Sequence, residues 1–140
     1  MATVHLGLGS NLGDRQAYLT KAIAALKDKG ITVLKVSPVI ETIPVGGPPQ
    51  GKYLNAVLKA ATTCGPHELH DITRSIEDRL GRVRGIVNGP RVIDIDILLY
   101  DDIKLITKDL IIPHPRMLVR DFVMQPLLKI DPAVCASLRI

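Results

Sequence analysis

The sequence predicts an α+β fold in which helices pack on a mainly antiparallel sheet. Short apolar, β-branched runs alternate with two longer segments of helical periodicity, in the order strand, helix, strand, strand, helix, strand. This order is typical of the ferredoxin-like α/β sandwich. The 140 residues are 46% hydrophobic and 23% charged, which predicts one ordinary globular domain over residues 1–140.

The first half of the chain contains three predicted strands and one helix. Residues 3–8 are apolar and β-branched, and a glycine-rich turn leads from them into a helix over 18–29. Residues 31–39 alternate like a half-buried strand. The segment 43–52 is too rich in proline and glycine to be regular, so we expect a loop there. Residues 54–61 predict a strand that pairs with 31–39 across this loop.

The second half begins with the most regular helix. Residues 66–80 open with a proline and carry apolar side chains at three- and four-residue spacing. Residues 92–100 predict the last strand of the sheet. Pro113, Pro115 and Pro126 predict loops and short helices in the remainder.

Composition narrows the class of partner. The net charge of +4 suits an anionic ligand but does not identify it. With no Trp, one Phe and three Tyr, the chain lacks the aromatic platforms of a single-strand nucleic-acid reader, so an RNA-binding module is the weaker alternative. No apolar run approaches the roughly 20 residues of a membrane span, and no export signal is recognisable. We therefore expect a cytoplasmic protein that binds neither membrane nor nucleic acid.

Two carboxylates in the last predicted strand are candidate metal ligands. Strand alternation sends Ile93, Ile95 and Ile97 to one face and Asp94 and Asp96 to the other. Residues two apart on a strand are about 6.6 Å apart, close enough to repel and well placed for two Mg²⁺ ions about 4 Å apart. A solvated acidic face on an amphipathic edge strand would explain the same pattern.

Cationic residues next to this strand favour phosphate chemistry. Arg82, Arg84 and Arg91 precede the two carboxylates in a glycine-containing segment, and arginine binds phosphate oxygens bidentately. A basic surface loop is the alternative interpretation. More donors lie in a proline-rich segment further along the chain, where the histidine is equally consistent with a structural role: His114, Arg116 and Arg120.

Other motifs carry less information. Tyr53 and Asn55 share one face of a strand and offer a ring and an amide that could read a heterocycle. The glycines of segment 7–13 fit neither the dinucleotide fingerprint nor a Walker loop, so we interpret them as a tight turn from strand into helix. His67 and His70 lack zinc-site spacing and receive no role.

Eight segments together closely resemble the 6-hydroxymethyl-7,8-dihydropterin pyrophosphokinase family, from Val4 to about Pro132. They are Gly7-x-Gly9-Ser10-Asn11-Leu12-Gly13-Asp14, Glu41-Thr42-x-Pro44-x-Gly46, Tyr53-Leu54-Asn55, Ile76-Glu77, Gly81-Arg82-x-Arg84, Gly89-Pro90-Arg91-x-Ile93-Asp94-Ile95-Asp96-Ile97, Pro113-His114-Pro115-Arg116 and Arg120-x-Phe122-Val123. The resemblance implies a ferredoxin-like fold. It also implies transfer of the β,γ-diphosphate of ATP to 6-hydroxymethyl-7,8-dihydropterin, giving AMP and the pterin diphosphate of folate biosynthesis.

The resemblance also implies roles for single residues. Asp94 and Asp96 would hold two Mg²⁺ ions, and Arg82 and Arg91 would steady the migrating diphosphate. The implied pterin site consists of Thr42, Val45, Gly46, Tyr53, Asn55 and Phe122. The implied ATP site consists of Glu77, Arg82, Arg84, Arg91, Ile97, His114, Arg116 and Arg120.

Two departures from the family pattern shape further expectations. Members often carry an aromatic residue just before Gly-Pro-Arg, where this chain has Val87 and Asn88, so we expect the loop 85–90 to close on nucleotide less firmly. Family chains usually run past Ile140, which leaves three alternatives for this chain: naturally short, trimmed, or cut from a fusion with a neighbouring folate enzyme. We expect a monomer. A nucleotidyltransferase that attacks the α-phosphorus of ATP is the rival enzyme class.

Overall fold

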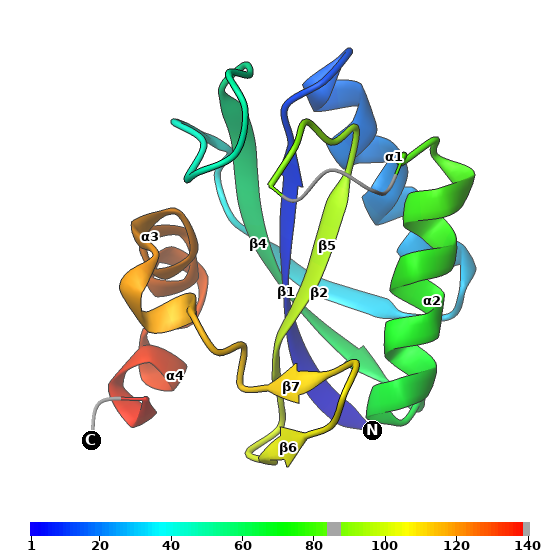
Figure 1. Ribbon diagram of the computed structural model, residues 1–140. Coiled ribbons are helices and arrows are strands. Elements are labelled where there is room, and N and C mark those ends of the chain that lie inside the picture. The colour runs from blue at the N-terminus through cyan, green and yellow to red at the C-terminus, as the bar shows by residue number, and fades with distance from the viewer. Residues whose placement is uncertain (84–87, 139–140) are drawn as a thin grey trace.

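The structure is a computed structural model that describes residues 1–83 and 88–138. Two helices and five strands form its main layers (Figure 1). In chain order these are β1 (Ala2–Ser10), α1 (Arg15–Asp28), β2 (Thr32–Val36), β3 (Ile40–Thr42), β4 (Tyr53–Thr62), α2 (Pro66–Arg79) and β5 (Asp94–Tyr100).

The sheet has the strand order β2-β4-β1-β5, with β3 also paired to β4, and all of these pairings are antiparallel. β4 lies between β1 and β2, and β1 lies between β4 and β5. Each strand-helix-strand unit is therefore split by a strand from the other unit, which is the ferredoxin-like arrangement. The predicted α+β fold with a mainly antiparallel sheet is confirmed, as is the pairing of β2 with β4.

Helices α1 and α2 cover one face of the sheet (Figure 1). Asp14 caps α1 by accepting a hydrogen bond from the backbone N–H of Ala17 at 3.1 Å. Gly30 follows the end of α1 with a φ of +81°, a left-handed conformation that glycine adopts without strain. Leu6 and Leu26, both fully buried, belong to the core between these helices and the sheet.

The opposite face carries α3 (Asp121–Ile130) and α4 (Pro132–Ser137), which follow a 3₁₀ turn at Met117–Val119. α3 packs over β4, and Val57, Leu98 and Leu127 belong to the second core cluster on this side. At the far end of the face, buried Asp131 accepts hydrogen bonds from His5 Nε2 at 2.8 Å and from Lys59 Nζ at 3.1 Å. These polar contacts tie the start of α4 to β1 and β4.

Three local expectations need correction. The predicted strand 31–39 is interrupted after Val36 and resumes as β3. Pro126 lies inside α3, which is longer than a proline-rich segment suggested. A two-stranded ribbon of β6 (Leu105–Ile106) and β7 (Ile111–Ile112) was not predicted, because strands of two residues leave no periodic signal.

No helix in the described part of the chain is both long enough and apolar enough to cross a membrane.

Candidate active site

Two glycines leave the middle of the sheet without side chains on the face that carries α3. Gly7 and Gly9 lie inside β1. The predicted strand 3–8 already contained Gly7, but the predicted turn over 7–13 was wrong at Gly9, because the strand continues to Ser10. Gly9 pairs with Asn55 on β4 and with Asp94 on β5. A Cβ added to Gly9 would lie only 3.0 Å from Asn55 Oδ1. Glycine here therefore forms the floor of a hollow between the two neighbouring strands.

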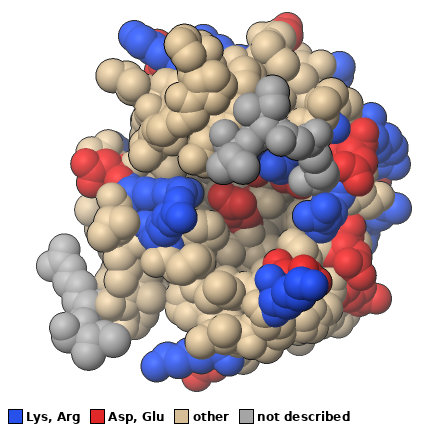
Figure 2. Space-filling model, viewed as in Figure 1, with Lys and Arg blue, Asp and Glu red and all other residues tan. Residues whose placement is uncertain are grey.

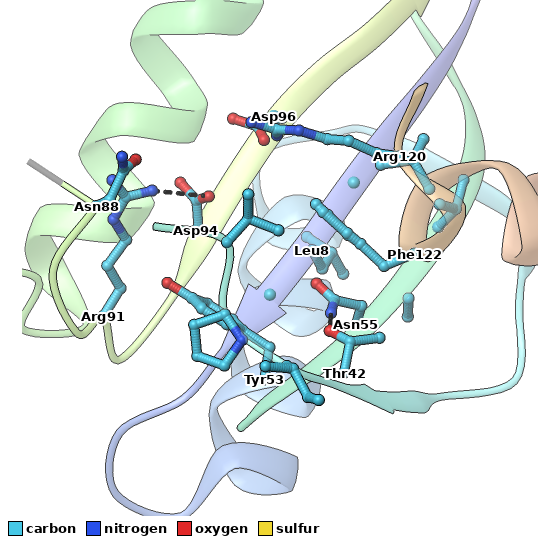
Figure 3. Close-up of a pocket in the computed structure, with 18 of the residues that line it drawn as sticks. Leu8, Thr42, Tyr53, Asn55, Asn88, Arg91, Asp94, Asp96, Arg120 and Phe122 are labelled. Carbon is cyan, nitrogen blue, oxygen red and sulfur yellow. Dashed lines mark hydrogen bonds and ion pairs between the residues drawn. The ribbon is translucent and has the colours of Figure 1, made fainter. Parts of the chain in front are cut away.

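This first hollow encloses about 740 Å³ of space, part of it open to solvent. Its walls come from four parts of the chain: β3 and the loop after it, β4, the segment before β5 together with β5, and the start of α3 (Figure 3). Predicted site residues that line it are Thr42, Val45, Tyr53, Asn55, Arg91, Asp94, Asp96, Arg120 and Phe122.

One end of the first hollow combines aromatic rings with an amide. Tyr53 and Phe122 approach it from β4 and α3, on opposite sides (Figure 3). Asn55 donates a hydrogen bond from Nδ2 to Thr42 Oγ1, which fixes the orientation of its carboxamide. Burial raises the pKa of Tyr53, so its hydroxyl stays protonated. This end is suited to a flat, hydrogen-bonding heterocycle.

The other end is charged. Asp94 accepts hydrogen bonds from Arg82 Nη1 at 2.9 Å and from Arg91 Nη1 at 3.2 Å. Asp96 has no comparably close cation among the described residues, and His114 Nε2 lies 3.9 Å from its Oδ2. Figure 2 shows acidic atoms at the bottom of a depression, with basic side chains on both sides.

The pKa of Asp96 is raised to about 7, first by burial and then by the negative charges of Asp94 and Glu77. Burial and the nearby cations Arg120 and Arg116 lower the pKa of His114, so it cannot neutralise Asp96 near pH 7. Asp94 and Asp96 therefore form a pair of mutually repelling carboxylates, and a bound cation would stabilise such a pair.

Glu77 supports this cluster from behind. Its side chain projects from α2, and the residue is only 3% exposed. Its Oε2 accepts from Arg82 Nη1 at 2.6 Å and from the backbone N–H of Ile95 at 2.8 Å. Glu77 lines neither hollow; it fixes the position of Arg82 relative to β5.

A second hollow adjoins the first and shares Asp96 with it. It lies along the outer edge of β5, where Ile95 directs its N–H away from β1 and toward Glu77. Ile97, two residues further, directs its backbone polar groups to the same edge. His114 also lines this hollow. Residues that the sequence did not indicate complete it: His70, Lys108, Asp109, Leu110 and Ile111.

Four predicted site residues lie apart from the hollow walls. Glu77 and Arg82 stand behind Asp94, and Gly46 lies next to the loop wall with a φ of +72°. Arg116 is exposed, and its backbone N–H donates to His114 Nδ1 at 3.3 Å. Arg84 and residues 85–87 of the expected closing loop lie outside the described residues.

Sequence reasoning also missed Asn11 and Gln50, which connect the segments around the first hollow. Asn11 lies within the Gly-Ser-Asn-Leu-Gly motif, but a motif alone does not reveal hydrogen bonds to residues 39 and 80 positions away. His70, another missed residue, was given no role, although α2 presents it to the second hollow.

Comparisons with known proteins show the family of this chain. Residues 5–132 match the family described as 7,8-dihydro-6-hydroxymethylpterin-pyrophosphokinase (HPPK). The chain is 46% identical over 127 residues to the 2-amino-4-hydroxy-6-hydroxymethyldihydropteridine pyrophosphokinase of Bacillus subtilis, covering 90% of this chain and 76% of that protein. It is 48% identical over 134 residues to the protein of the same name from Aquifex aeolicus, covering 96% and 83% respectively.

Among solved structures, the fold is similar to a crystal structure of an HPPK-DHPS in complex with substrates, with a TM-score of 0.70. The match covers 94% of this chain and 40% of the other, at 15% sequence identity. This likeness supports the fold alone.

Proposed function

Because this chain belongs to the 7,8-dihydro-6-hydroxymethylpterin-pyrophosphokinase family, we propose that it transfers the β,γ-diphosphate of ATP to 6-hydroxymethyl-7,8-dihydropterin in folate biosynthesis. The single observation that carries the proposal is that two hollows of different chemistry meet at Asp96. One has an aromatic and amide end, and the other runs along a strand edge. Two substrates bound in them would meet beside the carboxylates and arginines.

The first hollow is the proposed pterin site. Tyr53 and Phe122 would contact the two faces of the ring, and stacking of this kind contributes about 1 kcal/mol per aromatic pair beyond burial. Asn55 would hydrogen-bond the ring edge, because Thr42 already holds its carboxamide in place. The backbone from Val45 to Gly46 would complete the edge contacts.

The second hollow is the proposed nucleotide site. The backbone edge at Ile97, which lines this hollow, can offer a purine one donor and one acceptor. His114 lines the same hollow with its Nε2 3.9 Å from Asp96 Oδ2, and its neutral form can donate to or accept from a phosphate-linked group. Arg116, Arg120 and Arg84 are proposed to bind the phosphates, and Glu77 acts in this scheme by holding Arg82.

The residues present suit two Mg²⁺ ions. In the part of the chain that the structure describes, no group of three or more His, Cys, Asp or Glu residues could hold a metal. Asp94 and Asp96 would therefore supply only two carboxylates. Mg²⁺ is commonly bound through one or two carboxylates, with substrate phosphates and water as the other ligands. When bound, Mg²⁺ would neutralise the phosphate charge that develops during transfer.

The proposed reaction is a direct displacement. The hydroxymethyl oxygen of the pterin forms a bond to the β-phosphorus of ATP, the bond from that phosphorus to the oxygen of AMP breaks, and the hydroxyl proton is released. Arg82 and Arg91 now donate to Asp94. Their remaining donors can bind the migrating diphosphate, so catalysis rests on positioning and electrostatics without a covalent enzyme intermediate.

The decisive experiment follows the nucleotide product. ATP, Mg²⁺ and 6-hydroxymethyl-7,8-dihydropterin should yield AMP and no free pyrophosphate. Release of pyrophosphate would instead indicate a nucleotidyltransferase that attacks the α-phosphorus. Tight RNA binding without turnover would indicate a binding module.

We also propose that the enzyme acts as a monomer. Both hollows are lined by residues of one chain, which is consistent with a monomeric catalytic unit. Sedimentation together with activity measured over a range of protein concentrations tests this, because a specific activity that rises with concentration would indicate an obligate oligomer.

A further inference from the structure

Asn11 connects two segments, 47–51 and 88–91, that are far apart in the sequence. It lies just beyond β1 and is only 6% exposed. Its Nδ2 donates to Gln50 Oε1 at 2.7 Å and to the carbonyl of Gly51 at 3.1 Å. Its Oδ1 accepts from the backbone N–H of Arg91 at 2.8 Å, and its own N–H donates to the Arg91 carbonyl at 3.0 Å. One carboxamide therefore uses both of its donors and its acceptor on these two segments.

A second bridge joins the same two segments. Gln50 Nε2 donates to the carbonyl of Asn88 at 2.6 Å. Gly47 lies directly beneath that carbonyl, with a φ of +79°, and a Cβ there would be 2.2 Å from the Asn88 oxygen. Only glycine allows this approach. Segments 47–51 and 88–91 are thus joined by two bridges. One runs from Gln50 through Asn11 to Arg91, and the other is the direct hydrogen bond from Gln50 to Asn88.

The two segments contribute to different parts of the proposed site. Gln50 lines the first hollow, in the same loop as Val45. Arg91 donates to Asp94, where the migrating diphosphate would lie. The chain of hydrogen bonds runs from the wall of the pterin hollow through Asn11 to the backbone of Arg91. A displacement of either segment strains bonds made by the same buried side chain, so the two cannot move independently.

We propose that Asn11 is a positioning residue that couples the filling of the pterin hollow to the placement of Arg91. The proposal rests on the proposed function, since it concerns the same two substrates. Asn11 touches neither hollow and acts only through Gln50, Gly51 and Arg91. Its expected effect is on the mutual dependence of the two ligands and on turnover, with a smaller effect on the affinity for either ligand alone.

The test measures how strongly a pterin analogue binds with and without a non-hydrolysable ATP analogue and Mg²⁺. The ratio of the two affinities is the coupling, which for two linked sites is typically about 5- to 150-fold. In Asn11→Ala we expect this ratio to fall to below about twofold and kcat to fall with it. Gln50→Ala, a half-buried loop position, should also lower the ratio. The double variant should lower it no further, because both substitutions interrupt one chain of bonds.

Ser10→Ala is the matched control. Ser10 is the adjacent residue, fully buried, and its Oγ has no hydrogen-bond partner among the described residues. Its removal should leave the coupling ratio unchanged. Hydrogen exchange of the Arg91 amide gives a direct readout, because protection should fall in Asn11→Ala and remain in Ser10→Ala.

The outcomes separate this inference from the proposed function. Loss of coupling in both Asn11→Ala and Gln50→Ala, in proteins that stay folded, supports the positioning role. Three outcomes overturn the positioning role: coupling that is retained in folded Asn11→Ala, a loss of thermal stability without a change in coupling, and independent binding of the two ligands in the wild type. If the wild type still forms AMP, the proposed function stands in each of these cases. A wild-type protein that forms no AMP overturns the proposed function and this inference with it. If Asn11→Ala does not fold, Gln50→Ala decides by the same ratio.

Discussion

Replacing Gly9 with alanine should weaken pterin binding about five- to tenfold. The added Cβ would lie 3.0 Å from Asn55 Oδ1 and 3.4 Å from Tyr53 Cδ1. The first contact is shorter than carbon and oxygen normally tolerate, so the carboxamide of Asn55 must shift by a few tenths of an ångström. Thr42 holds that carboxamide from the other side, so the shift spoils one hydrogen bond. A lost hydrogen bond costs about 1 kcal/mol, and each 1.4 kcal/mol is a factor of ten in affinity.

Gly7→Ala provides the matched comparison on the same strand. Its Cβ would meet Leu98 Cδ2 at 3.5 Å, an ordinary van der Waals distance, so the loss of pterin affinity should be clearly smaller. Calorimetry should be run with a pterin analogue in the presence of an ATP analogue and Mg²⁺, and separately with the ATP analogue alone. ATP affinity should stay the same in both variants. Equal pterin losses in the two variants, or none in Gly9→Ala, would refute the assignment of this hollow.

Four further changes test the charged and aromatic parts of the site. Asp94→Asn should remove most turnover while leaving the fold intact, and near-normal turnover at saturating Mg²⁺ would exclude Asp94 as a metal ligand. Asp96→Asn should flatten the pH dependence of stability in the metal-free protein. The pKa of Asp96 is about 7 when folded against about 3.9 in the unfolded chain, so the folded state holds this proton more tightly and loses stability as the pH rises through that interval. Thermal melts at pH 5 and pH 8 check this, and an equal pH response in wild type and variant would contradict it. Phe122→Ala should weaken pterin about fivefold, for a stacking loss of about 1 kcal/mol, with ATP affinity unchanged. Similar losses for both ligands would show that the ring is core packing. Glu77→Gln should lower kcat more than the KM for ATP or for pterin. Arg82 keeps a neighbour of the same shape but loses its charge-assisted hydrogen bond. An unchanged kcat in steady-state kinetics would argue against a role of Glu77 in holding Arg82.

Local patterns predicted much of the site. Strand alternation correctly placed Asp94 and Asp96 on the face opposite Ile95, because side-chain direction depends only on the strand itself. The same rule placed Tyr53 and Asn55 together. These inferences needed no knowledge of the remaining fold.

Features that depend on distant parts of the chain could not be predicted. Glycine is unfavourable within strands, so the predicted strand ended at residue 8 and Gly9 was assigned to a turn. The hollow, however, needs strand positions without side chains. The sequence did not indicate that Asn88, within the expected nucleotide loop, also lines the first hollow. Its φ of +54° is accessible to asparagine and unfavourable for the aromatic residue that the family pattern suggested.

The buried contact between His5 and Asp131 has a consequence for how this enzyme can be combined with others. It fixes α4 beside the first half of β1, where Ala2 pairs with Thr62, whereas Gly9 and the first hollow lie at the opposite end of that strand. The N-terminus and α4 are therefore at the end of the sheet opposite the first hollow (Figure 1). Another catalytic domain attached on that side would leave the entry to the first hollow clear. A pterin ester released from the hollow would then have to cross the length of the sheet to reach such a neighbour, which favours transfer through solvent over a shared tunnel.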